Sequence, residues 1–133
     1  MSPSKLRSNG SKRSTTAKAK AVAKRDVQGG AVALRRQFTL TQAQFAVALS
    51  VSIRSLAALE AGGVPTPAVA RRISELQRLR VALAEVVDAA EIGSWMLRPN
   101  AAFGGLKPLE VIERGEVDRI WAMIHELRSG GAS

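Results

Sequence analysis

The chain has 133 residues, a formal net charge of +9, no cysteine and one histidine, and 46% of its residues are hydrophobic. This length fits one domain, or two small helical units that share a core, and is too short for a TIM barrel or a full dinucleotide-binding fold. The lack of cysteine excludes disulfides and cysteine nucleophiles and favours a cytoplasmic protein. With His125 as the single imidazole, we expect no catalytic residue, no metal site and no cofactor, so an enzyme is the less favoured class.

The charge is unevenly distributed. Residues 1–25 carry eight lysines and arginines and no acidic residue, and residues 31–80 carry seven arginines against two glutamates. Residues 81–133, in contrast, carry five basic and eight acidic side chains. This asymmetry predicts a polyanion as the partner of the basic part and a different partner for the acidic part. Because no run of 18 apolar residues is present, we expect no membrane span.

Residues 1–30 are predicted to form a disordered basic arm. The segment is rich in Ser, Lys, Ala and Gly, so burial of large apolar groups cannot offset the entropy lost on ordering its backbone. The side chains of Lys18, Lys20, Lys24 and Arg25 are candidate contacts for DNA phosphates.

Apolar residues recur at helical spacing from residue 31 onward, and no alternating run is long enough for a sheet, so we predict an all-α fold. A first helix is expected over residues 31–37. Thr41 and Gln44 form the pattern of a capping box at the start of a second helix. Ser52 is placed to cap a third helix that ends near Glu60, before a pair of glycines.

The second half is predicted to contain four further helices. Thr66 and Pro67 begin a long amphipathic helix that we expect to run to Ala89. A short helix then ends before Pro99, and a loop over residues 100–108 follows, with paired glycines. Two more helices are expected, over residues 108–113 and from residue 116 onward, and the last presents the apolar residues Val117, Ile120, Trp121, Ile124 and Leu127.

The segment over residues 42–59 has the pattern of a helix-turn-helix, whose second helix would enter the major groove of DNA. Ser52, Arg54 and Ser55 lie at outward positions, and of these only Arg54 can read guanine through two parallel hydrogen bonds. Ser50 stands in the turn, where many such motifs carry glycine. A plain helical hairpin of a bundle is the alternative interpretation. From Gln42 to Leu56 the residues resemble the Xre-type helix-turn-helix.

A second stretch carries a sharper resemblance. The residues Trp95-Met-Leu-Arg-Pro99-Asn100, then Phe103-Gly-Gly-Leu-Lys-Pro-Leu109, Gly115 and the closing apolar helix resemble the toxin-binding C-terminal domain of the Xre/MbcA/ParS antitoxins. The resemblance implies an antitoxin of a type II toxin–antitoxin pair, whose partner is a RES-domain toxin that consumes NAD or uses it to modify a target. In that family the C-terminal domain covers the entrance to the toxin's NAD pocket, and the helix-turn-helix half binds operator DNA and represses its own operon.

The chain is therefore predicted to consist of the arm (1–30), an Xre-like helix-turn-helix domain (31–80) and a small helical toxin-binding domain (81–133). In the folded part the candidate DNA contacts are Gln42, Gln44, Ser52, Arg54 and Ser55. The toxin contacts that the resemblance implies are Trp95, Pro99, Asn100, Gly104, Gly105, Leu106, Pro108, His125 and Arg128. We expect a homodimer or a larger toxin–antitoxin assembly. The alternative is a stand-alone helix-turn-helix transcription regulator, whose C-terminal half dimerises or binds an effector.

Overall fold

The computed structural model describes residues 30–130, which contain helices and no strand, so the predicted all-α fold is confirmed. A helix over residues 30–37 is followed by α2 (Gln42–Leu49), α3 (Ile53–Glu60) and α4 (Pro67–Leu83). The second half contains the 3-10 turn η1 (Ala89–Glu91), α5 (Ile92–Met96), the 3-10 turn η2 (Ala101–Phe103), α6 (Pro108–Glu113) and α7 (Val117–Arg128). The predicted arm lies outside the described residues, except for Gly30.

Local capping explains where α2, α3 and α4 begin. The Thr41 amide donates to Gln44 Oε1 at 2.9 Å and the Gln44 amide donates to Thr41 Oγ1 at 3.1 Å, so the predicted capping box is present. Ser52 Oγ accepts from the amide of Ser55, and Thr66 Oγ1 accepts from the amide of Val69 ahead of a proline at the first helical position.

The predicted extension of the long helix to Ala89 is wrong, because α4 ends at Leu83 and has 17 residues. The amides of Val86 and Val87 both donate to the Leu83 carbonyl, at 3.0 and 2.8 Å, and close a turn. Asp88 then accepts a hydrogen bond from the Ala90 amide and starts η1. Two successive β-branched residues before an aspartate disfavour continuation of a helix, and the chain folds back here.

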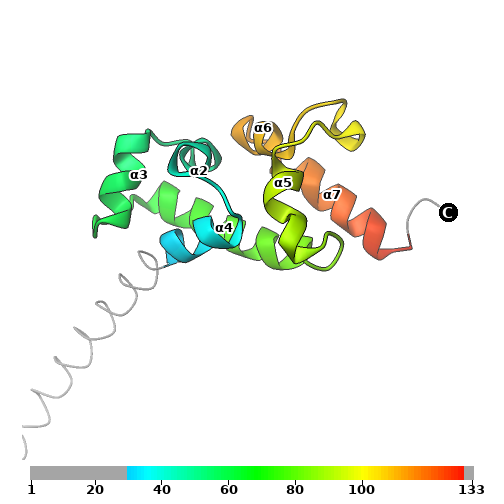
Figure 1. Ribbon diagram of the computed structural model, residues 1–133, viewed down its shortest axis with the longest axis horizontal. Helices are drawn as coiled ribbons and strands as arrows, with labels where there is room; N and C mark the ends of the chain where they lie inside the picture. Colours follow the sequence, from blue (N-terminus) through cyan, green and yellow to red (C-terminus); the bar gives the residue numbers. More distant parts are fainter. Residues whose placement is uncertain (1–29, 131–133) are drawn as a thin grey trace, which may run out of the picture.

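The two halves share one hydrophobic core. A continuous cluster of buried side chains runs from Ala31 to Ile124, and Phe38, Phe45 and Phe103 are among its largest members. In Figure 1, α4 runs beneath both halves, with α2 and α3 near one end and α5, α6 and α7 towards the other. Helix α2 contacts α6 directly, so the halves are joined by packing as well as by α4.

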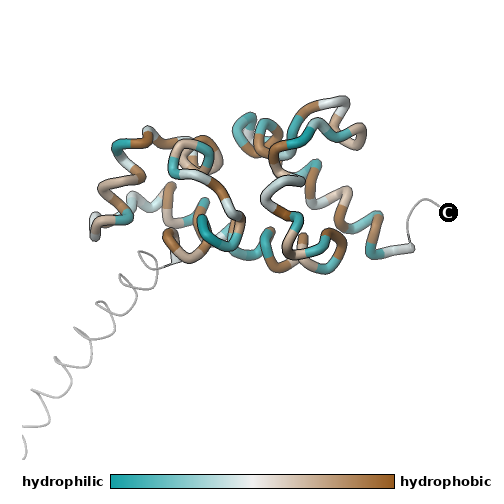
Figure 2. Tube along the Cα trace, viewed as in Figure 1, coloured by the Kyte–Doolittle hydropathy of each residue, from teal (hydrophilic) through white to brown (hydrophobic). Residues whose placement is uncertain are grey.

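Apolar and polar residues alternate along the helices instead of forming one long apolar segment (Figure 2). The apolar face predicted for the last helix is buried at Ile120 and Ile124, but Leu127 is 47% exposed because it lies in the final turn of α7. Within residues 30–130 no single helix is long and apolar enough to cross a membrane, and only the bent pair of α2 and α3 reaches that length and composition together.

Candidate functional sites

Helices α2 and α3 form a helix-turn-helix. They meet at 101°, within the range of about 90–120° that is typical of this motif. Ser50 caps α2 in the left-handed conformation, with φ 56° and ψ 44°, where a glycine is more usual. Arg72 of α4 donates to Ser50 Oγ at 2.7 Å and so ties the turn to the next helix.

The outer surface of α3 is mostly small and apolar. Ile53, Arg54, Ser55, Ala57 and Ala58 are all exposed. Within residues 30–130, Arg54 makes no hydrogen bond or ion pair that would hold its guanidinium against the protein. This side chain is therefore available to a partner, and it has the planar shape that reads guanine.

The other predicted DNA contacts of this half are engaged in internal hydrogen bonds. Gln42 donates to Glu60 Oε1 at 2.8 Å, and Gln44 is held in the capping box. The hydroxyl of Ser52 donates to that of Ser55 at 2.9 Å, while it also accepts from the Ser55 amide. These four side chains order the ends of α2 and α3, so any contact they make with DNA must be shared with that structural role.

Hydrogen bonds join Arg35, Gln42 and Glu60 into a charged network. Arg35 donates to both carboxylate oxygens of Glu60, at 2.7 and 3.1 Å, and the side chain of Glu60 is only 9% exposed. The hydrogen bond from Arg35 lowers the pKa of the Glu60 carboxyl below its ordinary value of 4.5, against the opposing effect of burial, and the bond from Gln42 acts in the same direction. The network links the helix over residues 30–37 to the end of α3.

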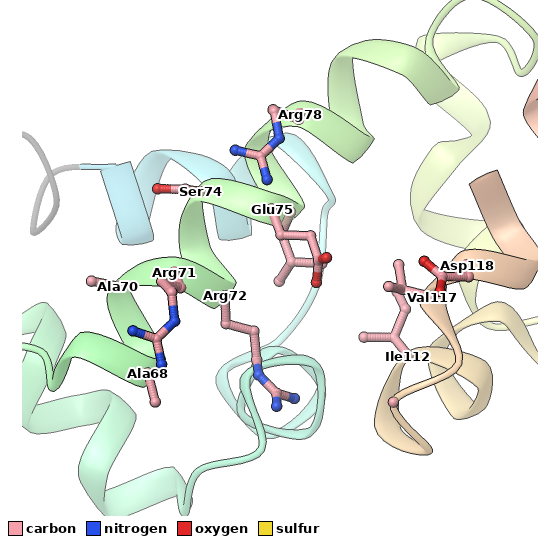
Figure 3. Close-up of a pocket in the computed structure, with 12 residues that line it drawn as sticks. Ala68, Ala70, Arg71, Arg72, Ser74, Glu75, Arg78, Ile112, Val117 and Asp118 are labelled. Carbon is pink, nitrogen blue, oxygen red and sulfur yellow. The ribbon is translucent and has the colours of Figure 1, made fainter.

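A groove of about 740 Å³ separates α4 from the turn between α6 and α7. Figure 3 shows Arg71, Arg72 and Arg78 on the α4 wall, with Val117 and Asp118 on the opposite wall. Arg72 is the arginine that contacts the turn of the helix-turn-helix, so this wall adds positive charge next to that motif. From the sequence alone these arginines belonged only to the polar face of the long helix, and no groove was predicted beside them.

The loop over residues 99–108 is closed on itself by Asn100. Its amide donates to the Leu106 carbonyl, its carbonyl accepts from the amides of Phe103 and Gly105, and its side chain accepts from the Ala102 amide at 2.9 Å. Gly104 and Gly105 have φ of 64° and 90°, which side chains with a Cβ rarely adopt. A Cβ built on either glycine would meet nothing within 4 Å, so both face open space.

Side chains beneath the loop fix it to the body of the protein. The ring of Phe103 is buried, and Trp95 packs edge-on against it with ring centroids 6.3 Å apart. The guanidinium of Arg119, in the first turn of α7, lies 5.9 Å from the centroid of the same ring. Pro108 is buried at the first position of α6, whereas Leu106 is half-buried and Pro99 is exposed.

The two remaining residues predicted to contact a partner lie elsewhere. Arg128 pairs with Glu85, just beyond the end of α4, at 2.6 Å, and His125 is exposed one turn earlier. Arg119, which contacts the loop, is roughly 14 Å from Arg128 along the helix axis. The structure therefore gathers Trp95 and the residues of the loop at one end of α7 and places His125 and Arg128 towards the other. Lys18, Lys20, Lys24 and Arg25 lie outside the described residues.

Family models match both halves of the folded chain. Residues 82–127 match the antitoxin Xre/MbcA/ParS C-terminal toxin-binding domain, and residues 33–76 match a helix-turn-helix. The first match contains the whole loop closed by Asn100, and the second contains α2 and α3.

Similar proteins agree with these matches. The chain is 33% identical over 92 residues to the mycobacterial cidal antitoxin MbcA of Mycobacterium bovis and of Mycobacterium tuberculosis, which covers 68% of this chain and 81% of each relative. It is also similar to a chain in the crystal structure of the M. tuberculosis MbcT–MbcA toxin–antitoxin complex, with a TM-score of 0.65, 28% identity, and coverage of 80% of this chain and 96% of that one. The chain therefore belongs to the Xre/MbcA/ParS family of antitoxins and carries a helix-turn-helix in its N-terminal half.

Proposed function

We propose that this antitoxin neutralises a RES-domain toxin by covering the entrance to the toxin's NAD pocket. The observation that carries the proposal is the loop over residues 99–108. Four hydrogen bonds to Asn100 preorganise it, Phe103 anchors it in the core, and its two glycines present an open backbone surface. A preorganised loop loses little conformational entropy when it binds a partner. The similar chain of the MbcT–MbcA complex, which is a toxin–antitoxin pair, supports a protein partner.

The antitoxin acts by binding and not by catalysis in this proposal, and it requires no cofactor. His125 and Arg128 form a second contact area at the far end of α7, so the toxin would extend along that helix. The acidic side chains of the C-terminal third complement a pocket that otherwise holds the phosphates of NAD.

We also propose that the helix-turn-helix binds operator DNA in the cytoplasm and represses the operon of the antitoxin. Arg54 supplies base recognition from α3, and the lysines of the arm add contacts to phosphates that depend on salt. Two helix-turn-helix units reach successive major grooves when the protein is a dimer, so the active form is a homodimer or a larger assembly with toxin.

The test uses the full chain and a RES-domain toxin. NAD consumption by that protein is measured while the antitoxin is titrated. We expect inhibition to saturate at a fixed stoichiometry. Ala102 is exposed at the surface of the loop, and Ala102→Glu should weaken inhibition by about tenfold or more, because it places a charge and extra volume in the interface.

Ala68→Glu is the matched control. Ala68 is also exposed but lies in the first turn of α4, away from the loop, so inhibition should be unchanged. If no RES-domain protein is inhibited while DNA is still bound, the protein is a stand-alone transcription regulator, whose C-terminal half dimerises or binds an effector.

A further inference from the structure

The outer face of α3 carries one large apolar side chain, that of Ile53. It is 53% exposed and stands at the first position of the helix, directly before Arg54. Ala57 and Ala58, one turn later, are exposed as well. Because residues four positions apart share a face of a helix, Ala57 continues the face of Ile53, and Ala58 continues that of Arg54.

Arg54 provides the hydrogen-bonding groups of this face that are not used within the protein. The hydroxyls of Ser52 and Ser55 bond to each other at 2.9 Å, and Ser52 Oγ also accepts from the Ser55 amide. The guanidinium of Arg54, in contrast, makes no hydrogen bond or ion pair to any residue from 30 to 130. The remaining exposed side chains of the face are isoleucine and alanine, which have no polar atom. Hydrogen bonds from α3 to base edges therefore depend on Arg54, and the rest of the face can make only apolar contacts.

The 5-methyl group of thymine is the apolar group that the bases present in the major groove. We propose that Ile53 recognises this methyl group, on a thymine close to the guanine that Arg54 contacts. A β-branched side chain has few rotamers, so it loses little entropy when it packs against a methyl group. The alanines of the face let the backbone of α3 approach the bases. The assignment rests on the proposed binding of α3 to operator DNA and adds a second base that the helix reads.

The small size of the apolar surface favours DNA over a protein as its partner. The buried centres of protein interfaces are enriched in aromatic and other large apolar side chains, whereas here one isoleucine stands with alanines beside an arginine. Helix α3 also lies outside residues 82–127, which match the toxin-binding domain. In Figure 1, it lies at one end of the molecule, while α5, α6 and α7 lie towards the other.

Replacement of thymine by uracil in the DNA tests the assignment directly. Uracil keeps the hydrogen-bonding edge of thymine and lacks only the 5-methyl group. The duplex from upstream of the gene is prepared with thymine and again with uracil at every thymine position, and the affinity of the full chain for each is measured. The wild-type chain should bind the thymine duplex about fourfold more tightly or better, the change expected when one methyl group is withdrawn from water.

Three variants separate the contribution of Ile53 from other effects of the uracil duplex. Ile53→Ala should bind the thymine duplex more weakly and should bind both duplexes equally, because two changes that remove the same contact are not additive. Arg54→Ala should weaken binding to both duplexes and keep their ratio. Leu127→Ala is the matched control, since Leu127 is 47% exposed but lies in α7, and it should behave as wild type. All three side chains are exposed, so thermal melts of the variants should match that of the wild-type chain.

The outcomes distinguish this assignment from the proposed function. Equal affinity of the wild-type chain for the two duplexes would overturn the role of Ile53 and leave DNA binding intact. No binding to either duplex would overturn the proposed operator binding, and the assignment with it. A preference for thymine that survives in Ile53→Ala would assign the methyl contact to another residue. Unchanged DNA binding by Ile53→Ala, together with loss of inhibition of the RES-domain toxin, would show that this face of α3 contacts the toxin instead.

Discussion

A Cβ atom built on Gly93 would lie 2.7 Å from the carbonyl oxygen of Phe38 and 2.5 Å from Oγ1 of Thr39. Gly93 belongs to α5 of the C-terminal half, and Phe38 and Thr39 form the turn after the first helix of the N-terminal half. The two halves thus touch at a point where α5 has no room for a side chain at position 93.

We expect Gly93→Ala to destabilise the fold by about 1–3 kcal/mol, because the added methyl group meets a backbone carbonyl that cannot move independently. Urea unfolding measures the change. Gly30→Ala is the control, since the Cβ there would meet only the end of the flexible Gln77 side chain. Equal stability of the two variants would mean that the backbone at this contact can shift at little cost in free energy.

Ser50→Gly should stabilise the protein by about 0.5–1 kcal/mol. A left-handed residue with a Cβ costs about 1–2 kcal/mol, and two effects offset part of the gain: the extra freedom of glycine in the unfolded chain and the loss of the exposed hydrogen bond from Arg72. Ser50→Ala keeps the strained φ of 56° and loses the hydrogen bond from Arg72, so it should not stabilise. Thermal melts of the three proteins decide the matter, and a gain in the alanine variant would contradict this explanation.

Stability should depend on pH through Glu60. The pKa of its carboxyl is lowered in the folded state, so its contribution to stability is fully present above pH 4.5 and is lost as the pH falls through the lowered folded pKa. Glu60→Gln should cost about 1–3 kcal/mol at pH 7, and the difference from wild type should shrink at acid pH.

Glu116→Gln is the control for this measurement. Its ion pair with Arg119 is exposed on both sides, so the change should be under about 1 kcal/mol. Unfolding free energies measured from pH 3 to 7 provide the comparison. A constant difference between wild type and Glu60→Gln over that range would contradict the role of Arg35.

Arg54→Ala should reduce the preference for operator over random DNA by about 1–3 kcal/mol, which is the contribution of one bidentate contact from arginine to guanine. The measurement is binding to the DNA upstream of the gene and to a scrambled duplex of equal length. Arg114→Ala, at the end of α6, is the control and should leave both affinities unchanged. Equal losses on the two duplexes would assign Arg54 to phosphate contact.

Deletion of residues 1–25 should weaken binding to all DNA sequences alike. Each phosphate neutralised by the arm contributes about 0.9 to the slope of log affinity against log salt concentration, so the slope should become shallower. Titrations at several salt concentrations test this. A slope that matches the full chain would show that the eight basic side chains of this segment do not contact DNA.

Local signals in the sequence identified most of the helices. Thr41, Ser52 and Thr66 cap their helices through hydrogen bonds to residues three positions later, and such short-range patterns are visible in one dimension. The end of α4 was missed because the apolar spacing continues past Leu83, while the turn at Val86 and Val87 depends on how the chain packs back. The resemblance around Trp95 and Pro99 indicated the family, and the matches to known antitoxins confirm it.

Most of the helices, the caps at Thr41, Ser52 and Thr66, and the helix-turn-helix could be predicted from the sequence, since each depends on neighbours along the chain. Three contacts could not: Gly93 meets Phe38, Arg119 lies over Phe103 away from Arg128, and Val81 stays exposed beside Trp121. Those relationships join residues distant in sequence, and packing of α2, α4, α6 and α7 around one core sets them. A periodic pattern reports which face of a helix is buried, but not which helix buries it.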